Sequence, residues 1–223
     1  MIPGRPFFQP QWIVDNLDEI GRRLGEHVVM TVIAVAVGFC ISFGVALVIR
    51  ERPRLYGPVI GITGTIYSIP SLALFALLIP VTGISLLTAE IALVSYTLLI
   101  LVRNIVTALE GVSPDVIQAA DGMGYTARQR LWRVELPIAL PVIVAGLRIA
   151  TVTTIGLVAV TTLIGMGGLG YLIINSGIQR FFATSIYAGV ILSVALAVAA
   201  DLGLLAVQRR LTPWARAREG QPS

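Results

Sequence analysis

The chain has few of the residues from which soluble catalytic sites and disulfide scaffolds are built. Its 223 residues include one histidine, one cysteine and no lysine. A lone histidine, His27, leaves neither a metal cluster nor a Ser–His–Asp triad, and a lone cysteine, Cys40, cannot form an intrachain disulfide. Charged residues make up 13% of the chain, against about 25% in soluble domains. The composition therefore excludes a disulfide scaffold, a disordered chain and almost any soluble enzyme.

Long apolar runs occupy much of the sequence. Hydrophobic residues account for 56% of the chain, and a helix needs about 20 residues to cross a bilayer core of about 30 Å. The runs are continuous rather than alternating, which excludes a closed barrel. The sequence predicts an all-α, polytopic membrane protein. Its transmembrane domain covers residues 27–208, with five transmembrane helices over residues 27–49, 58–80, 84–102, 138–165 and 186–207.

The distribution of arginine predicts the orientation of these helices. Twelve of the sixteen arginines lie in the segments 50–57, 103–148 and 209–218, and the other four lie on the opposite face. Cytoplasmic loops carry an excess of basic residues close to the ends of spans. We therefore expect multi-pass insertion in the cell (inner) membrane, with the N-terminus outside and the tail 209–223 in the cytoplasm.

The first 26 residues have a different pattern. Ile13, Leu17, Ile20 and Leu24 recur at helical spacing, opposite a charged face. No apolar run precedes a small-residue cleavage site, so a signal peptide is not expected. The pattern predicts an amphipathic segment over residues 1–26, lying on the outer membrane surface or packed on the bundle.

The segment between the third and fourth predicted spans, residues 103–137, has about 35 residues, more than two antiparallel helices need. Ser113–Asp115 is typical of a helix start, with proline where its missing N–H costs little. Gly122 and Gly124 are expected to end that helix, and Thr126 can cap the next one. The pattern favours a compact docking element on the cytoplasmic face over the alternative, a solvated connecting loop.

A spaced motif runs through this loop. Gln118, Ala119 and Ala120 are followed by three residues, Gly124, nine residues and then Val-Glu-Leu-Pro at 134–137. The motif resembles the EAA loop of ABC importer permeases: E-A-A, three residues, G, nine residues, I-x-L-P. Gln118 replaces the usual glutamate and a valine the usual isoleucine. The resemblance implies a set of ATPase-coupling residues: Asp115, Gln118, Ala119, Ala120, Gly124, Arg128, Leu136 and Pro137.

The resemblance also implies partners. In that family the loop forms a coupling helix that inserts into a cleft on an ATPase subunit, and an external substrate-binding protein delivers the substrate. A second permease subunit, identical or different, completes the pathway, and membrane lipid surrounds it; no nucleic acid is expected. The chain has neither a P-loop nor paired catalytic carboxylates. We therefore expect a transport subunit that is not an enzyme and holds no cofactor or metal, with ATP and Mg on the partner ATPase.

Further stretches resemble one group within that family. Residues 67–74 and 77–80 look like the second span of glycine betaine, carnitine or choline permeases. The glycine-rich stretch 163–170 and the tail 207–213 are similar to the same group. The resemblance implies import of compatible solutes. A methionine or other amino-acid importer is the alternative within the family, and a membrane scaffold or secondary transporter without an ATPase is the alternative outside it.

The glycine-rich stretch also fits a dinucleotide-binding pattern. Residues 165–170 read G-x-G-x-x-G, but that fingerprint requires a preceding strand and a following helix in a βαβ unit. Here it follows an apolar span. The expectation is a flexible outer turn rather than a cofactor site.

Three ionisable residues interrupt the predicted spans, where such residues are costly and often functional. Arg148 and Asp201 fall at similar depth on consecutive antiparallel spans, so we predict an ion pair between them. The alternative is that Arg103 pairs with Asp201 closer to the surface. Glu90 is expected to be an outer-vestibule or packing residue.

Small and hydroxyl residues are frequent in the second and fourth predicted spans. They could permit close helix packing, or they could line a polar path through a broken or kinked helix. Pro70 removes a helical hydrogen bond in the middle of the second span. The pathway candidates are Tyr67, Ser68, Pro70, Thr153 and Thr154.

Overall fold

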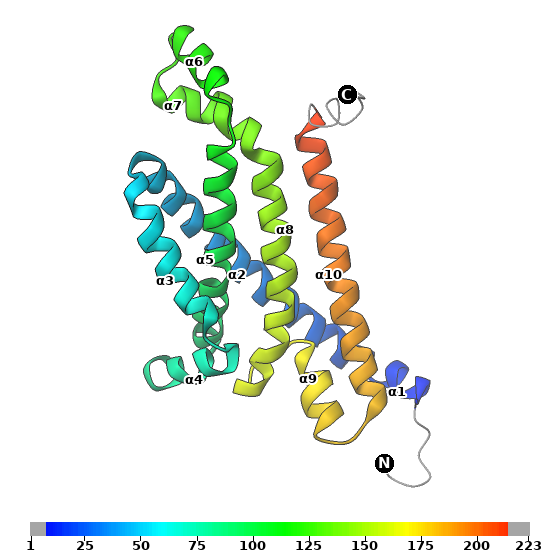
Figure 1. Ribbon diagram of the computed structural model, residues 1–223. Coiled ribbons are helices and arrows are strands. Elements are labelled where there is room, and N and C mark those ends of the chain that lie inside the picture. The colour runs from blue at the N-terminus through cyan, green and yellow to red at the C-terminus, as the bar shows by residue number, and fades with distance from the viewer. Residues whose placement is uncertain (1–7, 214–223) are drawn as a thin grey trace.

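The computed structural model describes residues 8–213, and within this range the chain is helical and contains no strand. Four long helices form the bundle in Figure 1: α2 (Leu17–Glu51), α5 (Leu86–Glu110), α8 (Leu136–Val160) and α10 (Ala183–Leu211). At one end of the bundle lie α6 (Pro114–Gly122) and α7 (Ala127–Arg130); α1 (Pro10–Asp15), α4 (Ser71–Thr82) and α9 (Gly170–Ile173) lie at the other.

The long helices account for four membrane crossings by length and composition. They are Leu17–Glu51, Leu86–Glu110, the continuous stretch Ala127–Ile164 and Ala183–Leu211. They overlap the predicted first, third, fourth and fifth spans. The third helix continues past residue 102 to Glu110, because buried apolar residues such as Ile105 and Leu109 keep helical spacing beyond Arg103. The connecting loop is therefore shorter than the predicted 103–137.

The predicted second span, residues 58–80, is not one helix. It is divided into α3 (Tyr56–Ser68) and α4, which meet at an angle of 97°. Ile69 is extended, with φ −69° and ψ 129°, because the proline that follows it disfavours the helical conformation. Figure 1 shows α4 lying across the end of the bundle rather than continuing α3. The described chain thus has four candidate spans, or five if the broken pair α3–α4 counts as one.

A tyrosine from the central helix stabilises this break. The hydroxyl of Tyr96, on α5, donates a hydrogen bond of 2.6 Å to the carbonyl oxygen of Ile69. The ring of Tyr67 packs edge-on against the ring of Tyr96, with 5.7 Å between centroids. The bend leaves the Ile69 carbonyl without a partner in its own helix, and an unpaired backbone group is costly in a membrane. Tyr96 supplies that partner.

Helix α5 is the centre of the bundle and packs against α2, α3, α4 and α8. One buried apolar cluster lies at its loop end, around Leu101 and Ile105, and a second lies at its opposite end, around Leu93 and Phe75 of α4. The contact between α2 and α5 is close: a Cβ atom on Gly38 would clash with the side chain of Thr97. Small residues at such crossings let two membrane helices approach closely.

At the end of the bundle opposite α6, helix α2 contacts several other segments. The helix runs without a break from Leu17, so the latter part of the predicted amphipathic segment belongs to the first span rather than to a separate element; α1 is a short helix of its own. Residues 1–7 of that segment lie outside the described range, as do residues 214–223 of the predicted tail.

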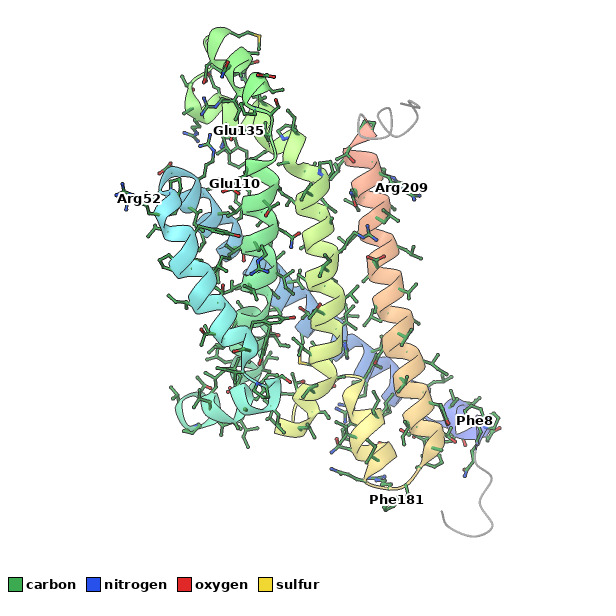
Figure 2. The ribbon with its side chains drawn as sticks, viewed as in Figure 1. Phe8, Arg52, Glu110, Glu135, Phe181 and Arg209 are labelled. Carbon is green, nitrogen blue, oxygen red and sulfur yellow. The ribbon has the colours of Figure 1, made fainter. Side chains whose placement is uncertain are left out.

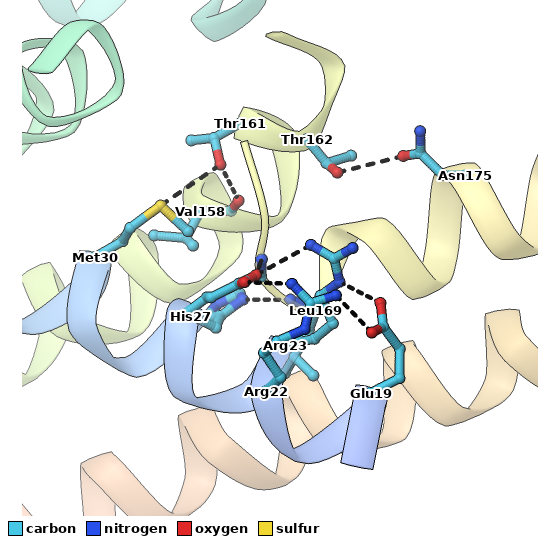
Figure 3. Close-up of polar contacts among 12 residues, drawn as sticks. Glu19, Arg22, Arg23, His27, Met30, Val158, Thr161, Thr162, Leu169 and Asn175 are labelled. Atoms are coloured by element: carbon cyan, nitrogen blue, oxygen red, sulfur yellow. Dashed lines mark hydrogen bonds and ion pairs between the residues drawn. The ribbon is translucent and has the colours of Figure 1, made fainter. Parts of the chain in front are cut away.

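The glycine-rich turn after α8 is held by this helix rather than left loose. Gly165 and Gly168 both have φ of +83°, a left-handed conformation that favours glycine. The Gly168 N–H donates to Glu26 at 2.9 Å, and the Leu169 N–H donates to Nδ1 of His27 at 3.2 Å (Figure 3). The other ring nitrogen of His27 lies 3.0 Å from the carbonyl oxygen of Ile155. The single histidine is thus a buried structural residue.

The hydroxyl of Tyr96 can be tested by removing it alone. We expect Tyr96→Phe to lower the stability of the purified protein by about 1 kcal/mol, the net worth of one hydrogen bond. Tyr67→Phe is the matched control, because the Tyr67 hydroxyl makes no hydrogen bond within residues 8–213. The measurement is the midpoint of thermal unfolding in detergent. Equal midpoints for the two variants would contradict a stabilising role for the Tyr96 bond.

Candidate functional site: the coupling loop and the intramembrane charges

Helix α6 begins at the residues that the sequence indicates. Ser113 is its N-cap, and its hydroxyl accepts a hydrogen bond of 3.3 Å from the Asp115 N–H. Pro114 occupies the first helical position, where an N–H would have no partner in the helix. The helix ends at Gly122, and α6 and α7 extend beyond the end of the bundle in Figure 1. The predicted helix start is confirmed.

The turn after α6 depends on Gly124, whose φ of +82° lies in the left-handed region. Thr126 then caps α7 in a reciprocal arrangement with Gln129. The Thr126 hydroxyl accepts from the Gln129 N–H, and the Gln129 side chain accepts from the Thr126 N–H at 2.9 Å. The segment is therefore a helix–turn–helix with fixed ends, as predicted, rather than an irregular loop.

The predicted coupling residues fall on two sides of this element. Asp115, Gln118 and Ala119 are exposed on α6, and Met123, the residue that follows the helix, is 69% exposed. Ala120 is 1% exposed and packs inward. Of the remaining residues, Gly124 and Arg128 are exposed at the turn and on α7, whereas Leu136 and Pro137 are half-buried in the first turn of α8. The exposed residues on α6, at the turn and on α7 are accessible to a partner. Ala120, Leu136 and Pro137 pack within the chain instead.

A chain of ion pairs beneath this loop is not foreseen from the sequence. Glu135 is 3% exposed and accepts two hydrogen bonds from the Arg50 guanidinium, at 2.9 and 2.7 Å, and one from Arg130 Nε at 2.9 Å. Arg130 also donates to both carboxylate oxygens of Asp121, each at 2.6 Å. The chain Asp121–Arg130–Glu135–Arg50 joins α6 to the end of α2. The sequence gives one indication of these ion pairs: an acidic residue, Glu135, directly precedes the apolar Leu-Pro start of α8.

The geometry of the backbone contributes to this arrangement. Residues Leu131–Glu135 form a π-helical turn between α7 and α8, a rare feature that recurs at functional sites. Figure 2 shows Glu135 on the bundle side of α6 and α7, above Glu110, whereas Arg52 points away from the bundle. Next to Glu135 lies a cavity of about 340 Å³, which also borders Ile117 of α6 and Leu109 of α5.

The structure contains the ion pair predicted within the spans. Arg148 of α8 donates from Nε to one carboxylate oxygen of Asp201 and from NH2 to the other, both at 2.8 Å. The side chains are 25% and 33% exposed in the single chain. The partner of Asp201 is therefore Arg148 rather than Arg103, and two parallel bonds make the pair geometrically specific.

The pathway candidates are in two places. Tyr67, Ser68 and Pro70 are exposed at the break between α3 and α4. Thr153 is half-buried on α8, and the neighbouring Thr154 is 1% exposed with its hydroxyl bonded to the Ala150 carbonyl of its own helix. In this conformation Thr154 presents no polar group to a path, so its side chain packs in the bundle.

Glu90 is the remaining intramembrane charge of the prediction. It is 8% exposed on α5, and neither carboxylate oxygen has a hydrogen-bond partner within residues 8–213. Its burial favours the packing role over the outer vestibule. No cluster of three potential metal ligands is present in the described part of the chain.

The arrangement is that of a helical bundle with a short helix, α6, beyond one end. A model of the family described as "binding-protein-dependent transport system inner membrane component" matches residues 38–213. The chain belongs to this family. It is an ABC importer permease, rather than the alternative membrane scaffold or secondary transporter without an ATPase.

Curated relatives match over nearly their whole length. The osmoprotectant import permease protein OsmW of Salmonella typhimurium is 39% identical over 210 residues, covering 91% of this chain and 96% of that protein. The glycine betaine/carnitine/choline transport system permease protein OpuCB of Bacillus subtilis is 32% identical over 199 residues, covering 89% of this chain and 91% of that protein. The match thus extends beyond the loop motif to the whole permease.

A solved structure supports the same assignment of the fold. A chain of the MetNI methionine ABC transporter in an inward-facing conformation superposes with a TM-score of 0.80 at 27% identity. The alignment covers 89% of this chain and 98% of that chain. The all-α membrane fold predicted from the sequence is confirmed.

The ion pair between α8 and α10 can be tested by charge exchange. We expect Arg148→Glu and Asp201→Arg each to reduce the amount of folded protein in the membrane several-fold, because each places two like charges together within apolar spans. The double variant restores the pair with reversed polarity and is expected to restore folded protein. The measurement is fluorescence-detected size-exclusion chromatography of tagged variants. A double variant as poor as both single variants would contradict the pairing.

Proposed function

We propose that this chain is the membrane-spanning subunit of an ATP-driven importer for quaternary ammonium osmoprotectants of the glycine betaine, choline and carnitine type. The observation that carries the proposal is the near full-length match to curated permeases with those solutes, or osmoprotectants, in their names. The methionine transporter chain is less similar in sequence, at 27% identity. Methionine import is therefore the second candidate, supported by the fold alone.

In this proposal α6 is the contact to an ATPase subunit. Its exposed residues include the polar Asp115 and Gln118 and the apolar Ala119, and the exposed Met123 follows directly after the helix. A mixed face of this kind suits a reversible protein interface. ATP and Mg are held on the partner, where hydrolysis takes place, and the permease changes conformation in response. A second permease subunit and an external binding protein complete the importer.

The proposed orientation places α6 and the end of α10 in the cytoplasm and α1 outside. Arginine supports this orientation, because Arg50, Arg52, Arg128, Arg209 and Arg210 all belong to the end of the bundle that carries α6. The N-terminal end of α2 and the glycine-rich turn then lie on the outer side, where a binding protein docks.

Substrate selection is proposed to lie mainly on the external binding protein. A selective site for a quaternary ammonium group needs several aromatic rings around the cation. Only 7% of this chain is aromatic, and Tyr67 and Tyr96 form the one aromatic pair at the α3–α4 break among the described residues. The permease itself is proposed to bind the quaternary ammonium cation only weakly, because Tyr67 and Tyr96 supply two rings rather than a complete cage.

Uptake by the assembled importer tests the proposal. The chain, its ATPase and its binding protein are reconstituted in proteoliposomes, and ATP-dependent uptake of radiolabelled glycine betaine, choline, carnitine and methionine is measured. We expect uptake of at least one quaternary ammonium solute and none of methionine. Methionine uptake alone would support the second candidate, and the absence of ATP-dependent uptake of all four would contradict the proposed function.

The turn after α6 gives a more local prediction. A Cβ atom has open space at both Gly122 and Gly124, but only Gly124 has a positive φ. We expect Gly124→Ala to strain the turn by about 1–2 kcal/mol and to weaken ATPase binding, whereas Gly122→Ala leaves binding unchanged. The measurement is the affinity of the purified ATPase for the permease in nanodiscs. Equal affinities for both variants would show that the turn geometry does not matter for docking.

A further inference from the structure

Helix α6 has little direct packing on the membrane helices. The elements that it contacts most are α7 and the π-helical turn Leu131–Glu135. The side of α6 that faces the bundle, at Ile117, borders the cavity of about 340 Å³ rather than a filled core. Along the backbone, a displacement of α6 reaches the bundle at α5, through residues 111–113, and at α8, through α7 and the π-helical turn.

The ion-pair chain begins at the same place. Asp121 is in the last turn of α6, Arg130 ends α7, and Glu135 ends the π-helical turn. From Glu135 the chain crosses to Arg50, in the last turn of α2 and far away in the sequence. The ion pairs thus connect α6 non-covalently to α2, whereas the backbone joins the loop only to α5 and α8.

The position of Arg50 determines where that connection leads. The segment Arg52–Leu55 joins α2 directly to α3, and α3 ends at the break before Pro70. A displacement of the end of α2 is therefore passed to α3, whose far end carries the pathway candidates Tyr67 and Ser68. Rigid helices move as units, so a shift at one end of α3 is felt at the other.

We propose that Glu135 is a positioning residue for transport: it transmits displacement of α6, through Arg130 and Arg50, to α2 and α3. The inference rests on the proposed function. Glu135 stands at the unspecified position of the Val-x-Leu-Pro segment, so its role is separate from that of the motif residues on either side. The residue touches neither substrate nor ATPase and acts through the arginines that it joins.

The physical basis is the cost of separating these groups. A buried carboxylate that accepts three hydrogen bonds from two guanidinium groups cannot lose one arginine without leaving charge poorly compensated. The connection thus resists stretching, and the bidentate contact with Arg50 also resists rotation. The adjoining cavity lies between Ile117 of α6 and the end of α2, so the ion pairs connect these two elements where side chains do not fill the space.

The test compares substitutions of residues in the ion-pair chain with a matched substitution of a surface arginine. Glu135→Gln removes the negative charge with almost no change of shape, and Arg50→Gln replaces the guanidinium with a shorter, neutral polar group. Arg50 belongs to α2, so its substitution leaves the docking face of α6 untouched. Arg52→Gln is the control: Arg52 is exposed, lies two residues from Arg50 and makes no ion pair within residues 8–213.

Three quantities are measured on the reconstituted importer: ATPase affinity, ATP hydrolysis and solute uptake. We expect Glu135→Gln and Arg50→Gln to keep ATPase affinity and hydrolysis near the values of the unmodified chain. Uptake per ATP hydrolysed is expected to fall about tenfold, within the usual range of coupling between sites. Because both residues act through one contact, the double variant should be no worse than Glu135→Gln alone. Arg52→Gln should behave like the unmodified chain.

The outcomes separate the inference from the proposed function. If the unmodified importer shows no ATP-dependent uptake, the proposed function fails. If it transports and both variants keep the unmodified ratio of uptake to hydrolysis, the transmitting role of Glu135 is wrong. A loss of protein yield with an unchanged ratio in the remaining importer would assign Glu135 a structural role only and would likewise overturn the inference.

Discussion

The absence of water in the bilayer is the constraint on which the rest of this structure depends. Every backbone polar group within the membrane needs a partner from the protein itself, and every regular element in the described range is a helix. The same constraint applies at the sharp break between α3 and α4 in the described range. The break before Pro70 frees the Ile69 carbonyl, and α5 provides the Tyr96 hydroxyl at that point. The central helix is thus both the core of the bundle and the support for its broken segment.

Polar contacts in the bundle are few and sit where elements distant in sequence must stay together. His27 and Glu26 hold the glycine-rich turn, Arg148 and Asp201 join α8 to α10, and Glu135 joins the loop to α2. Apolar packing fixes how closely the helices approach, but it does not by itself fix their register along their axes. Charge pairs and backbone hydrogen bonds supply that register because their geometry tolerates little displacement.

The sequence predicted the local features of the fold and one tertiary contact, the ion pair of Arg148 with Asp201, but missed the other contacts between distant segments. Hydropathy indicated the long helices, and Ser113, Gly124 and Thr126 indicated the ends of α6 and the start of α7. The ion pair of Arg148 with Asp201 was predicted from the similar depth of the two residues in the membrane on consecutive antiparallel spans. The angle of 97° between α3 and α4 could not be predicted, because a proline permits a range of bends. The contact of Tyr96 with Ile69 stabilises one of them. The pairing of Glu135 with Arg50 joins residues 85 apart in sequence, and periodicity carries no information about such a contact.

The close approach of α2 and α5 at Gly38 and Thr97 has an evolutionary consequence. No side chain fits at position 38 while threonine occupies position 97, so neither residue can become larger alone without separating the two helices. Substitution there requires a compensating change in the partner. Among related sequences the two positions should therefore vary together, with a larger residue at one accompanied by a smaller residue at the other, whatever solute the importer carries.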